Sequence, residues 1–513
     1  MAKEIEKKEG DTNTPFPIEP LSCTILLPKQ THRRPIKMIV LKNEVSFNDL
    51  EREIYEYGCE VARQLMKQAL TKLDDHLSKE RDTKVYRDKG RRKTSIKTLM
   101  GEVEYSRRVY QCDSKTGTGG KEYIYLLDQV LSVDKVGLFS GNLVQLIIEA
   151  ASSKSFRKSA DSISNSTGQK ISHGGAWNIV QAVGEKLDKI EKEQAKAVEQ
   201  ECSQGQREKP ILFEEADGVR ISIQGKERKK GKKQELKVSI SYEGWKEVSK
   251  GRYEVAHKLV CAGFEPAAEF RKRKEGMLGS EYNLDEIQMR IVNGDGGNWI
   301  KNHSEGEGVH YQLDPFHKSQ AIIKNVEDKQ ARTTMLTFLK ENKYEEILMY
   351  VSALEKDSLD AKTKEKLRNL YNYFSNNQLG LMPYLERDLD LPILEDGLVY
   401  RNMGTMEHNI CDVIGQRMKH RKGSWSIAGG SNMAKILAWK ASQKIKGVIN
   451  QFTSGQVSSK LTEVIQAPLS AAQVPKTIGN GYSYPTKGSW PFGGVFKTNG
   501  RNAIQRLVSD RVL

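Results

Sequence analysis

The sequence predicts a mixed α/β protein in which a helical and β-hairpin region precedes an α/β core with an all-α insertion. Three observations predict this class. Residues 136–200 carry apolar side chains at helical spacing, the runs after Pro210 become strand-like, and residues 318–378 return to helical character.

Composition agrees with a folded chain and points to an anionic partner. The chain of 513 residues is long enough for two to four domains. Of these residues, 37% are hydrophobic and 29% are charged, which is typical of globular proteins. The 82 Lys and Arg residues exceed the 67 Asp and Glu residues, so the formal net charge is +15. Such an excess favours binding to a polyanion such as nucleic acid, although a solvated basic surface is the alternative.

The cysteines and the chain's start exclude several classes of protein. Six cysteines stand far apart in sequence, which excludes a CxxC zinc or redox motif and argues against a disulfide framework. The N-terminal segment lacks a signal-peptide apolar core, and no run of 18 apolar residues occurs. We therefore expect a cytoplasmic protein with no membrane partner.

The N-terminal third predicts an arm, a helix and a hairpin. Residues 1–45 are polar and rich in proline, which predicts an extended arm. In residues 46–135, Ser46 is a candidate N-cap for one long amphipathic helix, and Gly101 is the expected turn of a basic β-hairpin. The hairpin charges are dense enough for phosphate contacts, although a solvated hairpin remains the alternative. They are Lys84, Arg87, Lys89, Arg91, Arg92, Lys93, Lys97, Arg107 and Arg108.

Residues 136–205 predict a helical region that resembles a helix-turn-helix. Three periodic segments are separated by breaks at residues 152–154 and at Gly168, and Ser172 is placed to open the third helix. A short helix, a tight turn and a second helix can place that second helix in a DNA major groove. Three-helix packing with no DNA role is the alternative.

Residues 206–320 predict the first part of the core. Strand-like runs cover residues 211–224, 236–245, 253–264 and 287–297, with a helix at 266–285 before the fourth and a fifth strand at 310–316. Three strands, a helix and another strand is the order of an RNase H-like core. Residues 321–390 then form the helical insertion, residues 391–445 the last part of the core with a helix at 404–420, and residues 446–513 an irregular C-terminal tail.

Two aspartates fall where the predicted strands would bring them together. Asp217 lies within the first strand, and Asp295 ends the fourth among three glycines. The first and fourth strands of an RNase H-like sheet are neighbours, so the two carboxylates would repel each other unless a divalent cation lay between them. Turn-forming aspartates beside glycines are the alternative.

Glu407 is the third candidate carboxylate. It begins the helix at 404–420, and Cys411, Ile414 and Met418 follow it at i+4, i+7 and i+11, which places it at the head of the predicted buried face. Three carboxylates that hold two Mg²⁺ or Mn²⁺ ions would suit phosphodiester chemistry. An ordinary first-turn acid favoured by the helix dipole is the alternative.

These motifs resemble bacterial insertion-sequence DDE transposases of the ISLre type, relatives of the Mutator-like transposases. The resemblance covers roughly residues 50–440 and rests on EADG, GDGGNW, LDPFH, MEHNICDVIGQRMKHRKGSWS and the basic hairpin. It implies an RNase H-like core interrupted by a helical insertion, with Asp217, Asp295 and Glu407 as the catalytic and metal-binding triad. It also implies a nucleoid-associated enzyme that cuts transposon ends, inserts them into target DNA and acts as a homo-oligomer.

The resemblance draws attention to a histidine and a tryptophan. His317, after Asp314 in the motif DPFH, would position DNA or the scissile phosphate, and a structural histidine is the alternative. Trp299 would stack on an unpaired base, and a core tryptophan is the alternative.

Several basic clusters would bind the DNA backbone, although lysines with no role are the alternative for part of the set. The clusters contain Lys226, Arg228, Lys229, Lys230, Lys232 and Lys233, then Arg271, Lys272, Arg273 and Lys274, then Arg417, Lys419, Arg421 and Lys422. Two rival functions remain open: a nuclease that does not transpose, and a non-catalytic DNA-binding regulator derived from a transposase.

Overall fold

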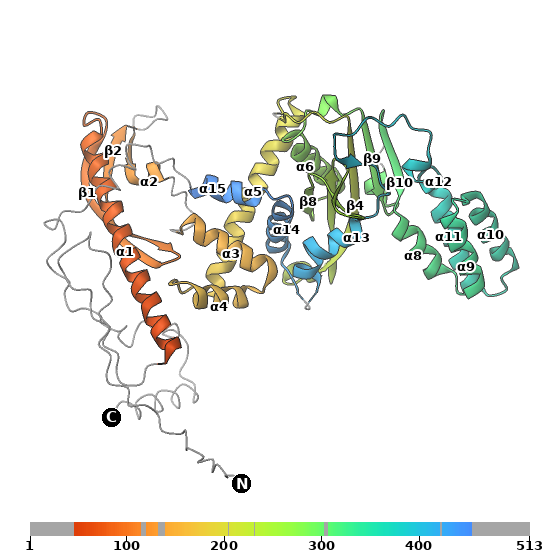
Figure 1. Ribbon diagram of the computed structural model, residues 1–513, viewed down its shortest axis with the longest axis horizontal. Coiled ribbons are helices and arrows are strands. Elements are labelled where there is room, and N and C mark those ends of the chain that lie inside the picture. The colour runs from red at the N-terminus through yellow and green to blue at the C-terminus, as the bar shows by residue number, and fades with distance from the viewer. Residues whose placement is uncertain are drawn as a thin grey trace, which may run out of the picture. The chain divides into compact units, whose positions relative to one another are not determined.

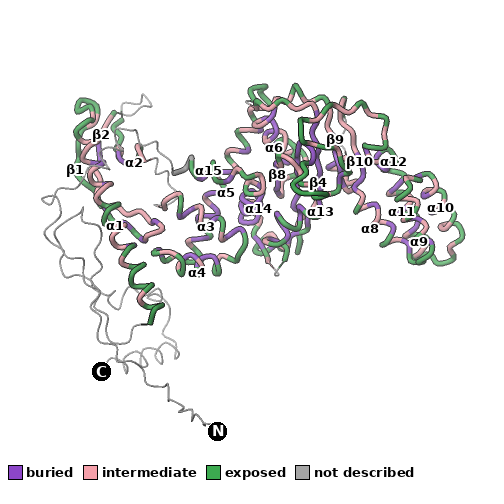
Figure 2. The backbone as a smooth tube through the Cα atoms, in the orientation of Figure 1, coloured by how far each residue is buried: buried purple, intermediate pink, exposed green. Residues whose placement is uncertain are grey.

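The computed structural model describes residues 46–453, apart from 114–119, 132–138, 204, 230, 302–305 and 421–422 (Figure 1). The predicted N-terminal arm and the C-terminal tail beyond residue 453 lie outside these residues. Within them, buried residues concentrate on the central sheet and the helices that cover it, whereas the first helix and strand are largely exposed (Figure 2). No helix in the described ranges is long and apolar enough to cross a membrane.

The N-terminal region contains the predicted long helix and the predicted hairpin. Helix α1 (Phe47–Glu80) packs on a three-stranded antiparallel sheet in which Gly101, at φ 114°, forms the turn between the first two strands. The other elements are β1 (Arg87–Thr98), β2 (Gly101–Asp113), β3 (Lys121–Ile124) and α2 (Leu126–Leu131). Their small core contains Leu70, Leu73, Val103, Tyr105 and Leu127.

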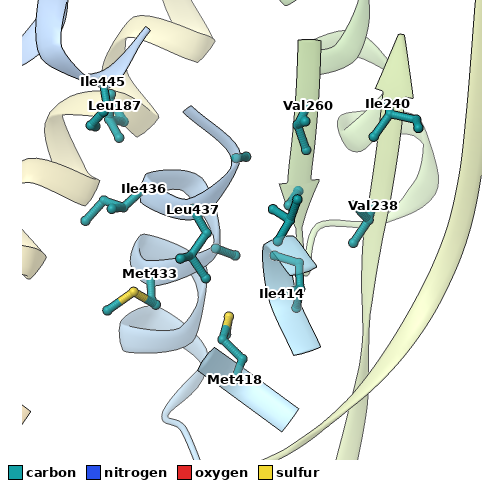
Figure 3. Packing of buried hydrophobic residues seen from close by; sticks show 14 of the residues in the cluster. Leu187, Val238, Ile240, Val260, Ile414, Met418, Met433, Ile436, Leu437 and Ile445 are labelled. Carbon is teal, nitrogen blue, oxygen red and sulfur yellow. The ribbon is translucent and has the colours of Figure 1, made fainter. Parts of the chain in front are cut away.

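Three helices follow, as the sequence predicts, and serine caps begin each of them. Ser140, Ser155 and Ser172 accept hydrogen bonds from backbone N–H groups in the first turns. The helices are α3 (Gly141–Ser153), α4 (Phe156–Ser166) and α5 (His173–Glu199). Their buried side chains belong to the same hydrophobic cluster as the central sheet, so they are part of its packing (Figure 3).

The central sheet has five strands in the order β10-β9-β4-β5-β8. β4 pairs in parallel with β9, and β9 pairs in parallel with β10, whereas β5 is antiparallel to both of its neighbours. The prediction that the first and fourth strands of the core are neighbours in the sheet is therefore confirmed. The strands and the helix between them are β4 (Ile211–Ser222), β5 (Lys233–Tyr242), β8 (Leu259–Gly263), α6 (Ala267–Gly279), β9 (Met289–Gly294) and β10 (Val309–Leu313).

One predicted strand is wrong in its extent. Residues 253–264 form two strands, β7 (Arg252–Val255) and β8, and these belong to different sheets. His257, at φ 52°, lies between them, and this left-handed conformation ends one strand before the next begins. β7 instead pairs with β6 (Trp245–Ser249), which also pairs with β11 (Leu398–Val399).

The predicted insertion is helical and has a hydrophobic core of its own. Met335, Val351, Leu370 and Phe374 are fully buried in that core, which also receives Leu313 from the end of β10. The helices are α8 (Pro315–Asn325), α9 (Lys329–Lys340), α10 (Tyr344–Asp357), α11 (Ala361–Asn376) and α12 (Gln378–Leu381).

The last described helices return to the central core. α13 (Met406–Asn409) continues into a π-helical segment, η4 (Ile410–Lys419), and two further helices are α14 (Ile427–Ala441) and α15 (Ile445–Thr453). The prediction that the irregular tail begins at residue 446 is therefore wrong, because α15 covers its first residues. Leu437 of α14 lies on the side of the helix toward the strands carrying Val238, Ile240 and Val260, whereas Met433 and Ile436 lie on its other side (Figure 3).

Candidate active site

Asp217 lies on β4, the middle strand of the sheet, where it pairs with Val238 of β5. Its side chain is 12% exposed, its Oδ1 accepts a hydrogen bond of 2.6 Å from the N–H of Gly218, and its Oδ2 lies 3.5 Å from Nε2 of His317. A Cβ at position 218 would lie 2.4 Å from a carboxylate oxygen of Glu235, which is the end of a flexible side chain. A buried carboxylate of this kind needs a cation or hydrogen bonds to compensate its charge.

Asp295 follows the last residue of β9 beside Asp217. Ala216 pairs with Gly294 in the parallel register, so the next residue of each strand is one of the two aspartates. Burial raises the pKa of Asp295 and the charge of Asp217 adds to the rise, whereas the N–H of Gly297, 2.8 Å from Oδ1, opposes it. The register thus brings together the two carboxylates that the sequence predicted to meet.

His317 is positioned by the start of α8. Asp314 caps that helix by accepting hydrogen bonds from the N–H groups of Phe316 and His317 at 2.8 and 3.2 Å. Burial by itself would lower the pKa of His317, but its hydrogen bond to Asp217 and the charge of that carboxylate outweigh burial, so the pKa is raised. The imidazolium can therefore neutralise part of the charge at this edge of the sheet.

A fully buried carboxylate, which the sequence analysis missed, lies two residues before Asp217 on the same face of β4. Glu215 accepts hydrogen bonds from Tyr242, Asn293, Gly404 and Thr405. The acidic pair in EEADG is a signal in the sequence. A strand pattern does not show, however, that the partner segment at Gly404 and Thr405 lies 189 and 190 residues away.

Glu407 lies where the sequence predicts, at the start of a helix, but its burial was predicted wrongly. Its side chain is exposed, and the buried apolar side chains of the segment are those of Met406, Ile410, Val413, Ile414 and Met418. The prediction assumed regular α-helical spacing from residue 407, whereas the segment from Ile410 onward is π-helical and Cys411 is exposed.

The structure therefore brings two of the three predicted carboxylates together, whereas the third, Glu407, is exposed. Asp217, Asp295, Asp314 and His317 affect one another electrostatically. In the described ranges, no three His, Cys, Asp or Glu side chains are arranged to hold a metal ion.

The helical insertion contacts the loop that carries Asp295. The hydroxyl of Tyr373, on α11, donates a hydrogen bond of 2.9 Å to the backbone carbonyl of Asp295. Asn377 packs against Gly296, where a Cβ would lie 3.0 Å from its amide nitrogen, and φ of that glycine is 90°. Sequence reasoning missed both contacts, because helical periodicity does not reveal which loop a helix touches.

Five of the predicted DNA-binding side chains are exposed. They are Arg91, Arg92 and Lys93 of β1, Lys229 of a short 3₁₀ turn, and Lys419 at the end of η4. β1 is an edge strand, and its residues from Arg87 to Lys93 are exposed on both faces. Arg92, Lys93, Lys229 and Lys419 remain available to phosphates, whereas Arg91 forms an ion pair with Asp75. Lys230 and Arg421 lie outside the described residues.

Two other predicted DNA contacts in the hairpin are corrected, because their charges are paired inside the protein. Arg107 forms an ion pair with Asp128 and lies 4.0 Å from the centre of the Tyr125 ring. Arg108 donates a hydrogen bond of 2.7 Å to Asp74, which is 1% exposed.

The same correction applies to two predicted contacts of the core. Arg417 donates to the carbonyl of Ala151 and lies over the ring of Trp425. Trp299 is half-buried and packs edge-to-face on Phe270 at 5.7 Å. These contacts favour the alternative interpretation, in which both side chains serve packing.

Two residues of the basic cluster at 271–274, Arg273 and Lys274, are also paired inside the protein, whereas Arg271 and Lys272 are exposed. Arg273 is 4% exposed and forms ion pairs with Asp188 and Glu191, and Lys274 pairs with the buried carboxylate of Glu214. The charges of Arg273 and Lys274 therefore connect α6 to α5 and β4 instead of facing a DNA backbone.

Comparison with known proteins places the whole site within one family. Residues 40–449 match the model of the Uncharacterised protein family (UPF0236). A UPF0236 protein of Caldanaerobacter subterraneus subsp. tengcongensis is 24% identical over 405 residues, covering 77% of this chain and 78% of the relative. The UPF0236 protein in the vanSb 3′ region of Streptococcus gallolyticus is 23% identical, covering 78% of this chain and 84% of the relative. The chain therefore belongs to the UPF0236 family.

Proposed function

We propose that this chain is a DDE transposase that cuts the ends of a DNA element and joins them to target DNA. The observation that carries the proposal is the pair Asp217 and Asp295 at one edge of a five-stranded sheet, with His317 beside them. The strand order, with only the second strand antiparallel to the others, supports an RNase H-like core. The helical insertion between β10 and Glu407 supports it too.

The relatives' names add an independent argument. One name from Caldanaerobacter joins eleven locus designations, and another from the same organism joins four. Many copies in one genome are what a mobile element would leave behind. We therefore infer that double-stranded DNA, at element ends and at the target, is the partner, and that copies of the chain assemble to bring two ends together.

The carboxylates fit a divalent cation. Magnesium and manganese prefer oxygen ligands, and the charge of Asp217 already raises the pKa of Asp295, so a cation would relieve their repulsion. Asp217 and Asp295 would hold it, and Glu407 would join them, because Glu407 lies two residues after Thr405, which is bound to Glu215. When bound, one or two such ions activate the attacking oxygen and stabilise the leaving oxygen.

The proposed reaction balances without a further reactant. Water attacks the phosphorus at an element end, the bond to the 3′ oxygen breaks, and a free 3′ hydroxyl results. That hydroxyl then attacks a target phosphodiester, so that one phosphorus–oxygen bond forms for each that breaks. His317, held by Asp217, lies beside the carboxylates where its positive charge would orient a phosphate.

A second candidate is a non-catalytic DNA-binding regulator, and one observation favours it: Glu407 is exposed and does not complete a three-ligand group with the aspartates. A nuclease that does not transpose would share the proposed site. The three functions differ in what they do to DNA that carries element ends.

The test is strand transfer with purified protein, Mg²⁺ and DNA that carries the gene's own flanking ends, beside the variant Asp295→Asn. We expect joined products from the native protein and none from the variant, with DNA binding retained by both. Cleavage without joining would favour the nuclease. Sequence-selective binding without cleavage would favour the regulator and overturn the proposal.

A further inference from the structure

We propose that Glu215 is a positioning residue that determines where Glu407 lies relative to Asp217 and Asp295. The inference rests on the proposed function, because it assigns a role to a residue that touches neither DNA nor the reacting phosphate. Glu215 lies on β4 with its side chain on the face of Asp217, and it binds the segment that leads into the helix of Glu407.

The hydrogen bonds of Glu215 bind the start of α13 to the middle of the sheet. Its Oε2 accepts from the N–H groups of Gly404 and Thr405 at 3.1 and 3.0 Å, and its Oε1 accepts from the Thr405 hydroxyl at 2.7 Å. Glu407 follows two residues later. The insertion separates these partners in sequence, so Glu215 is a direct link between the two parts of the interrupted core.

The same carboxylate also connects to the helix that carries His317. Asn293, on β9, donates hydrogen bonds from its amide nitrogen to Glu215 at 3.0 Å and to Asp314 at 2.7 Å. Asp314 is the N-cap of α8, and Gln312 fixes the amide of Asn293 by donating to its oxygen at 3.0 Å. One buried network thus holds the segments before both Glu407 and His317.

Every neighbour of this carboxylate named above can act as a donor. The backbone N–H groups of Gly404 and Thr405 can only donate, and the amide nitrogen of Asn293 does so as well. Glutamine at position 215 would turn an NH₂ group toward at least one of these donors. The segment would then be held more weakly, because hydrogen bonds to a carboxylate are stronger than those to a neutral amide, and the N–H of Thr405 would face the new NH₂ group at 3.2 Å.

The experiment measures the binding of Mn²⁺ alone to the full-length protein by calorimetry and by electron paramagnetic resonance. For Glu215→Gln we expect about 10- to 100-fold weaker binding, the size typical when a residue behind a metal ligand is replaced. We also expect a higher Mg²⁺ concentration for half-maximal cleavage than in the native protein. A purely structural role would lower the folded fraction without changing either metal dependence.

A matched control separates positioning from a general loss of stability. Glu243 is another buried carboxylate, 3% exposed, whose side chain pairs with Arg207, Lys209 and Tyr282 instead of with residues of the site. Glu243→Gln should destabilise the fold yet bind Mn²⁺ as the native protein does. Equal weakening by both substitutions would overturn the inference.

Thr405 provides a second route if Glu215→Gln does not fold. Thr405→Val removes only the hydroxyl donor and should weaken Mn²⁺ binding, and Thr405→Ser should restore it. Native affinity in Thr405→Val, or in a folded Glu215→Gln, would overturn the inference while leaving the proposed function intact. No Mn²⁺ binding by the native protein would overturn both.

Discussion

The two aspartates and the glutamate of the proposed triad occupy different kinds of structure. Asp217 and Asp295 lie on adjacent strands of the central sheet, and the strand register holds them together. Glu407 is exposed on a short helix that follows the insertion. The comparison teaches that one half of the site is built by the sheet, whereas the other depends on a few hydrogen bonds to a single segment.

The largest expected effect is the loss of chemistry when the sheet half is altered. Asp217→Asn should lower strand transfer by at least about 10³-fold, because members of a catalytic group fail together, while DNA binding is kept. Gel-based cleavage and a binding assay on the same preparation would measure this. Full activity in the variant would show that the sheet edge is not the reaction centre.

The aspartates of the sheet and Glu407 should also differ in how they affect the stability of the fold in the absence of metal. The pKa of Asp295 is raised in the folded protein, so its ionisation destabilises the fold as pH rises through the interval between the unfolded and the folded pKa. Asp295→Asn should therefore be more stable than the native protein at neutral pH in the presence of a chelator. Thermal unfolding of both proteins, with and without Mg²⁺, measures the difference.

Glu407→Gln is the matched variant for that measurement. Because its side chain is exposed, we expect a change in metal-free stability within about 0.5 kcal/mol, yet a loss of cleavage comparable to that of Asp217→Asn. A large change in metal-free stability would mean that Glu407 is a packing residue, and the contrast between the halves would disappear.

The smallest expected effect concerns the insertion. Tyr373→Phe removes the hydroxyl that binds the carbonyl of Asp295 and leaves the ring in place. We expect roughly tenfold slower cleavage at saturating Mg²⁺, because the loop of Asp295 would lose one of its supports. Single-turnover kinetics measure the rate, and an unchanged rate would assign the hydroxyl a purely structural role.

The basic residues show where sequence reasoning reaches its limit. Lys93 and Arg108 both belong to the predicted hairpin, but Lys93 is exposed, whereas Arg108 is bound to Asp74 of α1. Their local sequences do not separate them, because the partner carboxylate lies 34 residues away on another element. The serine cap at Ser172 was easier to predict, since a cap and its helix are neighbours in the chain.

α14 illustrates the same limit for a whole element. The sequence analysis assigned no separate helix to Ile427–Ala441, and the structure buries this helix on most of its surface. A helix buried on most sides lacks the alternation of polar and apolar faces by which amphipathic helices are recognised.

By itself, the sequence determined most of the helices and strands and the positions of the two aspartates, because periodicity, caps and glycines act over a few residues. Only the tertiary structure decided that Glu215 binds the segment before Glu407, that Tyr373 supports Asp295, and which arginines are paired. Those contacts join residues far apart in the chain, and they depend on packing that no local pattern encodes.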